Sequence, residues 1–252
     1  MNSKLEYFFK ENNKIAVAFS GGVDSSYLLW AAKRCGADVR AYCVCSEFQP
    51  AFEKEDAENI AEYLGAPTVM LNVSVLDSAE ITGNPSNRCY YCKKKIFSHI
   101  KAAAEKDGYT VIADGTNADD DVSDRPGMKA VEEFGVLSPL RQCGITKAEI
   151  RSGAHKAGLF VWSKPSYSCL ATRIAANVPI TADLLQKVST SESFLFKMGY
   201  RDFRVRTDGS EALIQVTEDQ HSKAAAELQY IEGFFRHIYS NTKLDEKTRK
   251  GK

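Results

Sequence analysis

Residues 20–26, with the sequence Ser-Gly-Gly-Val-Asp-Ser-Ser, have the composition of a phosphate-binding loop. They follow an apolar run at 15–19 and precede a helical pattern that begins at Tyr27. Glycines let backbone N–H groups approach an anion closely, and the N-terminus of the following helix adds a positive dipole. The alternative is an ordinary strand-to-helix turn with an acid or a serine as its cap. We predict nucleotide binding by six residues of the loop: Ser20, Gly21, Gly22, Asp24, Ser25 and Ser26.

Cysteines form a second candidate site. Cys89 and Cys92 have C-x-x-C spacing, which suits a zinc half-site, a redox pair or iron–sulfur ligands. Zinc would need a second pair of ligands, and the sequence has no other C-x-x-C and no H-x-x-x-H. A [4Fe–4S] cluster can use three cysteines and an external fourth ligand, and Cys169, in a polar loop beside Arg173, is the candidate third. The alternative is two buried thiols at the start of a helix. The remaining cysteines are predicted to be core or incidental thiols: Cys35, Cys43, Cys45 and Cys143.

Two arginines form a candidate anion clamp. Arg204 and Arg206 lie two residues apart on a predicted strand, so their side chains share one face. Two guanidinium groups on one face can hold a phosphate through paired hydrogen bonds. The alternative is an exposed, charged strand face.

The elements that must position these residues alternate along the chain. Strands are predicted at 15–19, 38–45, 68–73 and 110–113, and helices at 25–35, 52–64 and 93–106. This alternation predicts an α/β fold, a Rossmann-like parallel sheet with helices on both faces. Such sheets bind ligands beyond the carboxyl ends of their strands. The glycine loop lies at one such end, and Gly115 and Thr116 lie at another, so both are predicted to bind ATP.

The C-terminal third has a different pattern. Residues 118–145 read as a long polar loop, and Thr146 opens a helix with a capping box completed by Glu149. A helix at 181–198, two antiparallel strands at 203–206 and 212–216, and a helix at 218–238 predict a small α+β domain. We therefore expect domains at 1–165 and 166–242, followed by a charged, frayed tail at 243–252.

Bulk composition narrows the class of protein. The 252 residues include 33 Lys and Arg and 33 Asp and Glu, so a strongly basic nucleic-acid-binding protein is disfavoured. The sequence contains no run of about 18 apolar residues, so no membrane span is predicted, and the N-terminus lacks a signal-peptide core. These features predict a cytoplasmic protein. Seven cysteines, an odd number, are more typical of thiols or metal ligands than of disulfides in such a chain.

The glycine loop resembles the PP-loop of the ATP pyrophosphatase superfamily, whose members split ATP between the α- and β-phosphates. Over about residues 5–240 the chain resembles the LarE family, ATP-dependent sulfur transferases that help to build the nickel pincer cofactor of lactate racemase. The motifs that carry this resemblance, in family order, are Asn84-Pro85-x-x-Arg88-Cys89-Tyr90-Tyr91-Cys92-Lys93, Gly115-Thr116-Asn117-Ala118-Asp119-Asp120, Arg125-Pro126-Gly127, Ser138-Pro139-Leu140, Lys147-x-Glu149-Ile150-Arg151, Trp162-x-Lys164-Pro165 with Cys169, and Arg204-x-Arg206.

The resemblance implies a mechanism. A carboxylate of a pyridinium dicarboxylate mononucleotide attacks the α-phosphate of ATP, and sulfur then displaces AMP from the acyl-adenylate to leave a thiocarboxylate. Developing charge on pyrophosphate needs donors and Mg²⁺, for which Asp24 is a candidate ligand. Family members with three cysteines resemble cluster enzymes that deliver an extra sulfide. Cys89, Cys92 and Cys169 therefore predict the cluster type, which needs a sulfide donor. The alternative is sacrifice of the Cys169 sulfur, which leaves dehydroalanine.

Other roles are also implied by the resemblance. The family's matching arginines hold the substrate phosphate, and Glu192 falls where the family has a glutamate near the active sulfur, so it is a candidate metal ligand or proton carrier. Family members form ring-like homo-oligomers. This chain departs from the family at 212–215, where Ala-Leu-Ile-Gln replaces the frequent Ala-Arg-Ile-Glu and puts an acidic ligand or oligomer contact there in doubt.

Three other functions remain open at the level of sequence. A tRNA thiolase of the same superfamily would bind tRNA in a steeply salt-dependent way. An amide-forming ligase similar to NAD synthetase would not need the three cysteines. A nucleotide-sensing module with a structural metal would bind ATP without releasing pyrophosphate.

Overall fold

A computed structural model describes residues 2–121 and 126–249 of the chain. The chain divides into two compact units: unit 1 comprises Met1–Val75 and Asn87–Lys164, and unit 2 comprises Leu76–Ser86 and Pro165–Lys252. The sequence had predicted a continuous first domain, whereas the structure assigns Leu76–Ser86 to the second unit. Leu76–Ser86 belongs to the second unit because it is bonded to a segment far along the chain. The Asn84 side chain donates to the carbonyl of Ala175 at 2.8 Å and to that of Val178 at 3.1 Å.

Unit 1 contains a four-stranded parallel sheet in the order β3-β2-β1-β4. Its strands are β1 (Lys14–Ala18), β2 (Asp38–Cys45), β3 (Thr68–Asn72) and β4 (Ile112–Ala113). The register pairs Ile15 with Val39, and Ala16 with both Arg40 and Ile112. The predicted Rossmann-like α/β fold is confirmed.

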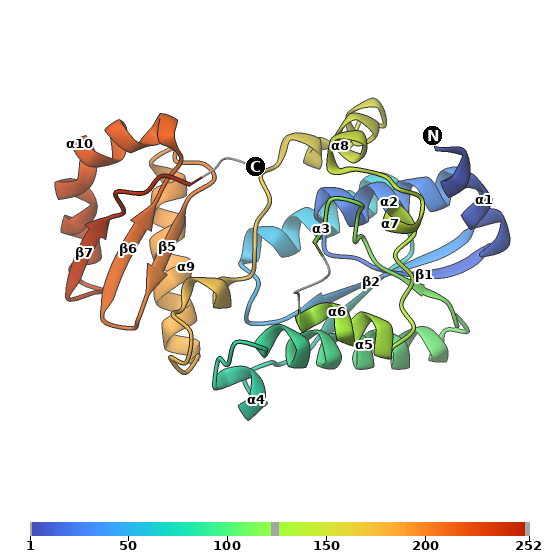
Figure 1. The fold of residues 1–252 in the computed structure, drawn as a ribbon, viewed down its shortest axis with the longest axis horizontal. Coiled ribbons are helices and arrows are strands. Elements are labelled where there is room, and N and C mark those ends of the chain that lie inside the picture. Colours follow the sequence, from blue (N-terminus) through green and yellow to red (C-terminus); the bar gives the residue numbers. More distant parts are fainter. Residues whose placement is uncertain (1, 122–125, 250–252) are drawn as a thin grey trace. The chain divides into compact units, whose positions relative to one another are not determined.

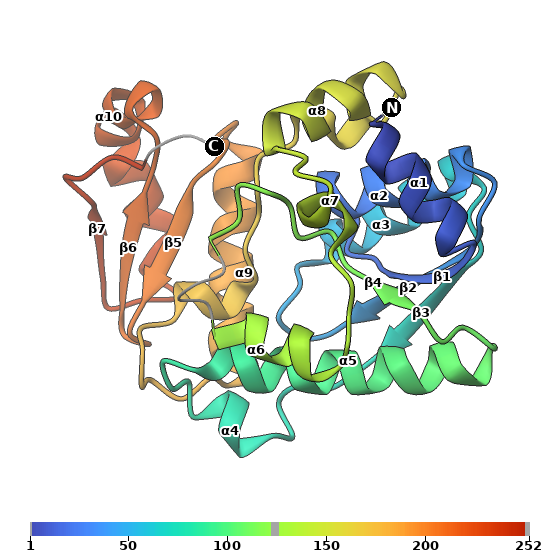
Figure 2. The ribbon, with the colours of Figure 1, turned by 45° about the vertical axis from the view of Figure 1, so that its right-hand side comes forward.

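Helices cover both faces of this sheet (Figure 1, Figure 2). They are α1 (Ser3–Glu11), α2 (Val23–Arg34), α3 (Ala51–Leu64), α5 (Arg88–Lys106), α6 (Pro126–Glu133), α7 (Pro139–Gln142) and α8 (Lys147–Lys156), followed by the 3₁₀ helix η1 (Phe160–Ser163). Ile15 and Val17 pack with α1, α2, α3, α7 and α8, whereas Ala16 packs with α5 and α6. Successive strand residues point to opposite faces, which is why the sheet has an apolar core on each side.

The region from 118 to 145 is less irregular than the sequence suggested. It contains α6, whose Ala130 and Val131 are buried, and the short α7. The prediction of one long polar loop was therefore wrong for these helices, because apolar residues spaced for a helix are few in so short a segment. Asp124 and Arg125, which the predicted loop included, lie outside the described residues. The capping box of α8 is confirmed: Thr146 and Glu149 exchange hydrogen bonds.

Unit 2 is the small α+β unit that the sequence predicted. It contains α4 (Ala79–Thr82), the 3₁₀ helix η2 (Leu170–Arg173), α9 (Ala182–Lys197), β5 (Arg204–Thr207), β6 (Glu211–Gln215), α10 (Glu218–Phe235) and β7 (Asn241–Leu244). β5 and β6 are antiparallel, and α9 and α10 pack against the sheet through an apolar core (Figure 1).

The segment predicted as a frayed tail begins in regular structure. Lys243 and Leu244 belong to β7, which pairs in parallel with β6, and Arg249 forms a bridge with Thr217. The sequence missed this strand because it is four residues long and Leu244 is its one apolar residue. Residues 250–252 lie outside the described part of the chain. Within the described ranges, no helix is long and apolar enough to cross a membrane.

Candidate functional site

The glycine loop of unit 1 joins the carboxyl end of β1 to α2. Gly21 has a φ of +72°, and a Cβ added there would lie 2.8 Å from the Ala57 Cα atom. Gly22 is the N-cap of α2 and has no side chain to accept from the first-turn N–H groups. The Ser25 hydroxyl accepts from the Ser20 N–H at 3.2 Å and donates to the Gly22 carbonyl at 3.2 Å. The loop therefore presents backbone donors and a helix N-terminus, as an anion site requires.

Gly115 brings the second predicted ATP segment against this loop. A Cβ at Gly115 would lie 2.8 Å from the Ser25 nitrogen, so only glycine permits the approach. Thr116 follows, and its hydroxyl donates to Asp114 at 2.7 Å. Neighbouring parallel strands β1 and β4 end at the same edge of the sheet, which is why these two segments meet there.

Lys147 is a residue of this site whose role the sequence did not reveal. Its Nζ lies 2.5 Å from Asp24 Oδ2, and Asn117 donates to the other carboxylate oxygen at 3.3 Å. Lys147 is the first residue of α8, directly after the N-cap Thr146, so the start of the helix sets the position of the Lys147 backbone. The only signal in the sequence was its place in a family motif.

The third predicted serine differs from the other two. Ser26 is fully buried, and its hydroxyl has no hydrogen-bond partner within residues 2–121 and 126–249. The predicted role of Ser26 as a phosphate donor stays a prediction.

The cysteines of the C-x-x-C pair lie inside a helix. α5 begins at Arg88, five residues before the predicted start, so Cys89 and Cys92 share one helix face one turn apart. Cys89 is exposed and Cys92 is partly exposed, so the alternative of two buried thiols is wrong. Cys169 belongs to unit 2, where it immediately precedes η2 and is partly exposed. In the described part of the chain, no three His, Cys, Asp or Glu side chains gather into a metal site.

The other four cysteines are core thiols, as predicted. Cys43 and Cys143 are buried, and Cys35 and Cys45 pack against the same core. Burial, with its neighbour Cys45, raises the pKa of the Cys43 thiol to about 12. A thiol of this kind is inert at neutral pH.

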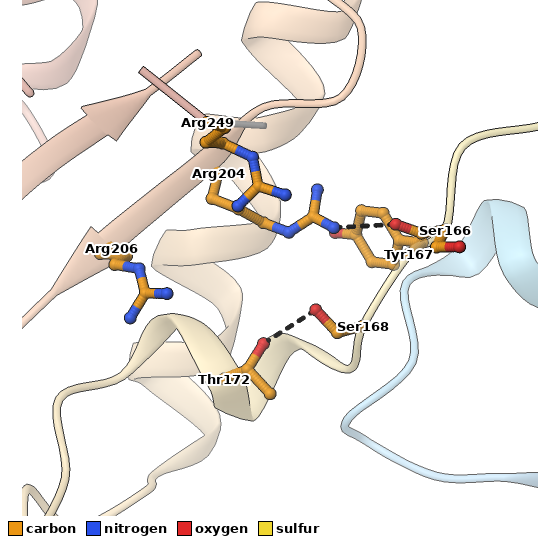
Figure 3. Close-up of a pocket in the computed structure, with 7 residues that line it drawn as sticks. All are labelled: Ser166, Tyr167, Ser168, Thr172, Arg204, Arg206 and Arg249. Carbon is orange, nitrogen blue, oxygen red and sulfur yellow. Dashed lines mark hydrogen bonds between the residues drawn. The ribbon is translucent and has the colours of Figure 1, made fainter. Parts of the chain in front are cut away.

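Three arginines surround a pocket of about 430 Å³ in unit 2 (Figure 3). Arg204 and Arg206 of β5 both line it, so the structure brings the predicted clamp together. Arg249 is a third arginine that sequence reasoning placed in the tail. The other lining residues are Ser166, Tyr167, Ser168 and Thr172. Ser168 and Thr172 flank Cys169 in the chain.

The three arginines donate hydrogen bonds to neutral oxygen atoms and to the carboxylate of Asp202. Arg204 donates to the Ser166 carbonyl at 2.9 Å, and Arg206 donates to the Gln215 side chain at 2.7 Å. Arg249 contacts Asp202 at 3.3 Å, while its Nε is buried without a hydrogen-bond partner in the described residues. Burial, and then the charges of Arg173 and Arg249, lower the pKa of Arg204 to about 10. Such a crowded positive site favours an anion.

Glu192 lies beneath this pocket rather than open to it. It is 2% exposed and pairs with Arg173, whose Nε lies 2.9 Å from Glu192 Oε1. The Tyr167 hydroxyl and the Val205 N–H also donate to its carboxylate. Burial, and then the Glu192 charge, raise the pKa of Tyr167. The predicted metal-binding or proton-carrying role of Glu192 stays a prediction.

Comparisons with known proteins agree with this geometry. A family model described as asparagine synthase matches residues 9–90, which contain the glycine loop. An uncharacterised protein of Synechocystis is 34% identical over 224 residues, covering 87% of this chain and 84% of that protein. A tRNA-specific 2-thiouridylase of Pseudothermotoga lettingae is 28% identical over 189 residues, covering only 60% of this chain and 54% of that protein.

A further relative carries a specific enzyme name. The pyridinium-3,5-bisthiocarboxylic acid mononucleotide synthase of Lactiplantibacillus plantarum is 31% identical over 211 residues, covering 83% of this chain and 76% of that enzyme. The match therefore extends over most of both chains, whereas the tRNA enzyme matches a smaller part. With the glycine loop at the carboxyl edge of a Rossmann-like sheet, this similarity shows that the chain belongs to the LarE family of ATP-dependent sulfur transferases.

Proposed function

We propose that this enzyme adenylates a carboxylate of a pyridinium dicarboxylate mononucleotide with ATP and converts it to a thiocarboxylate. The observation that carries the proposal is the arginine pocket, one side of which is formed by Ser168 and Thr172, the neighbours of Cys169. The segment that carries Cys169 therefore also forms part of the wall of the pocket that the three arginines line. This combination suits a substrate that carries both a nucleotide phosphate and a carboxylate.

The glycine loop serves the first half of the reaction. A substrate carboxylate oxygen attacks the α-phosphorus of ATP, the bond to the β-phosphate breaks, and pyrophosphate leaves. Backbone N–H groups at Gly21, Gly22 and the start of α2 bind the departing charge. Asp24 is the proposed Mg²⁺ ligand, and when bound the ion neutralises pyrophosphate. Lys147, which pairs with Asp24 in the structure, is placed to bind the same phosphates.

The cysteines serve the second half. We assign Cys89, Cys92 and Cys169 as thiolate ligands of a [4Fe–4S] cluster, because all three are accessible and thiolates are the ligands such clusters take. When bound, the cluster supplies the sulfide that becomes the thiocarboxylate sulfur. A sulfide-level sulfur supplied in this way would replace AMP on the acyl carbon, and AMP would leave with the carboxylate oxygen that the adenylation activated. The arginine pocket, Arg204, Arg206 and Arg249, anchors the mononucleotide phosphate meanwhile.

The test supplies ATP and the pyridinium dicarboxylate mononucleotide to the full chain purified without oxygen. Pyrophosphate release and the mass of the product are measured, with Cys169→Ala as the matched variant. The expected result is pyrophosphate release together with a product in which sulfur replaces one oxygen. Cys169→Ala should still release pyrophosphate but form no thiocarboxylate. Pyrophosphate release without any sulfur product from the parent chain would overturn the proposal.

The sulfur source is decided by two further measurements on the same samples. Stoichiometric iron and acid-labile sulfide, lost in Cys89→Ala, would support the cluster. Absence of iron after reconstitution, with conversion of Cys169 to dehydroalanine during turnover, would show instead that its own sulfur is transferred. The mass of the Cys169 peptide distinguishes these outcomes.

The wider setting follows from the product. We propose that the thiocarboxylate enters assembly of the nickel pincer cofactor of lactate racemase, in the cytoplasm, and that the enzyme is a homo-oligomer resupplied by a sulfide donor. A tRNA substrate is less favoured, because the tRNA-enzyme match covers less of both chains. Retention on tRNA that weakens steeply with salt would favour that alternative.

A further inference from the structure

Glu192 and Arg173 form an ion pair that is almost completely buried in unit 2. Their exposed fractions are 2% and 1%. Arg173 donates from Nε to Glu192 Oε1 at 2.9 Å and from Nη2 to Oε2 at 3.1 Å. The Val205 N–H donates to Oε1 at 2.9 Å, and the Tyr167 hydroxyl donates to Oε2. Each carboxylate oxygen thus has two donors, and the side chain is almost completely shielded from water.

The Arg173 guanidinium also bonds to the loop that carries Cys169. Nη1 of Arg173 donates to the Ser168 carbonyl at 2.5 Å and to the Cys169 carbonyl at 3.1 Å. It also lies 2.9 Å from the Thr172 hydroxyl oxygen. A single buried cation therefore shapes the backbone on both sides of the sulfur.

The opposite end of the network reaches the arginine pocket. Val205, which donates to Glu192, lies between Arg204 and Arg206 on β5. The Tyr167 ring lies 5.2 Å from the Arg204 guanidinium carbon and 4.4 Å from that of Arg173. Glu192 is consequently bonded both to the strand that carries the clamp and, through Arg173 and Tyr167, to the loop that carries the sulfur.

We propose that Glu192 is a positioning residue that fixes the Cys169 loop relative to the phosphate pocket through Arg173 and Val205. The inference rests on the proposed function for the meaning of the pocket and the sulfur, but its geometry lies within unit 2. A buried network in which every member is bonded has one favoured arrangement, because a broken member leaves an unpaired charge. A sulfur displaced by about 1 Å can lose on the order of a hundredfold in rate.

The test compares Glu192→Gln with the parent chain in two measurements that need no turnover. One is the dissociation constant of inorganic phosphate, measured by calorimetry. The other is the rate of Cys169 alkylation by iodoacetamide after treatment with an iron chelator, read from the mass of its peptide. Tyr167→Phe is the second variant, because it removes one hydroxyl and retains the ion pair. Ser191→Ala is the control, since Ser191 is buried beside Glu192 and bonds instead to the Lys187 carbonyl.

Glu192→Gln should weaken phosphate binding and raise the alkylation rate, each on the order of tenfold, because a charged partner is lost from several hydrogen bonds. Tyr167→Phe should shift both values in the same direction by less, and Ser191→Ala should shift neither. Unchanged phosphate binding and alkylation in Glu192→Gln would overturn the inference. If Glu192→Gln does not fold, Tyr167→Phe decides. If the parent binds no phosphate, the pocket assignment fails, and the alkylation rates alone decide the role of Glu192.

Discussion

Replacing Gly21 by alanine should damage both the stability of unit 1 and its ATP site. Two separate costs follow from the structure. The first is conformational, because the φ of +72° is unfavourable for an L-residue by about 1–2 kcal/mol, partly offset by about 0.4–1 kcal/mol of lost freedom in the unfolded chain. The second is steric, because the new Cβ would meet Ala57 Cα at 2.8 Å and its backbone nitrogen at 2.9 Å. Such overpacking costs about 1–3 kcal/mol.

Gly36 provides a matched control for the conformational cost alone. Its φ is +76°, and a Cβ there would have no heavy atom within 4 Å. Gly36→Ala should therefore lose only about 1 kcal/mol, whereas Gly21→Ala should lose about 1–3 kcal/mol more. For a chain of this size, each kcal/mol lowers the melting temperature by roughly 2–4 °C.

The assay combines thermal or urea unfolding with calorimetric ATP binding. Gly21→Ala should bind ATP on the order of tenfold more weakly, because the loop must move away from α3 and misalign its N–H donors. Gly36→Ala should bind ATP as the parent does. Equal stability of the two variants, with unchanged ATP binding in Gly21→Ala, would refute the role assigned to this close contact.

Three further predictions concern other parts of the molecule. Arg206→Ala should weaken the binding of inorganic phosphate, measured by calorimetry, on the order of tenfold. The melting temperature should change little because the Arg206 side chain is exposed. An unaltered phosphate affinity would show that Arg206 does not bind the phosphate. Lys147→Met should weaken ATP binding by a similar factor and leave the melting temperature nearly unchanged, because its pair with Asp24 is partly exposed; full ATP affinity would assign the lysine a structural role. Hydrogen bonds, led by that from Tyr42, lower the pKa of Asp107, so its stabilising effect is present above the unfolded-state pKa and is lost as pH falls through the folded-state pKa. Asp107→Asn should therefore reduce the difference between urea midpoints at about pH 6 and about pH 3, and an unchanged difference would contradict this sign.

Local sequence patterns were sufficient for much of the fold. The strand at Asp38–Cys45 has the bounds that were predicted, because the apolar run at 41–45 within it is typical of a strand buried on both faces. The α8 helix begins at its predicted cap, since Thr146 and Glu149 satisfy each other within four residues. In contrast, the strand Asn241–Leu244 is stabilised by pairing with Glu211–Ile214, some thirty residues away, and its own residues give little signal.

The same distinction applies to the functional residues. The sequence by itself predicted the glycine loop, the C-x-x-C pair and the paired arginines of β5, because a glycine turn and the i,i+2 spacing of a strand are local properties of the backbone. That Cys89 and Cys92 lie within α5 and are accessible was shown by the structure. Only the tertiary structure decided that Lys147 meets Asp24, that Arg249 joins the pocket, and that Glu192 is enclosed by Arg173. These partners are 123 residues apart in the first case and 19 in the last. Their pairing depends on which faces of the helices and strands pack together. The spacing of residues along the chain does not predict which charged side chains on different elements will meet.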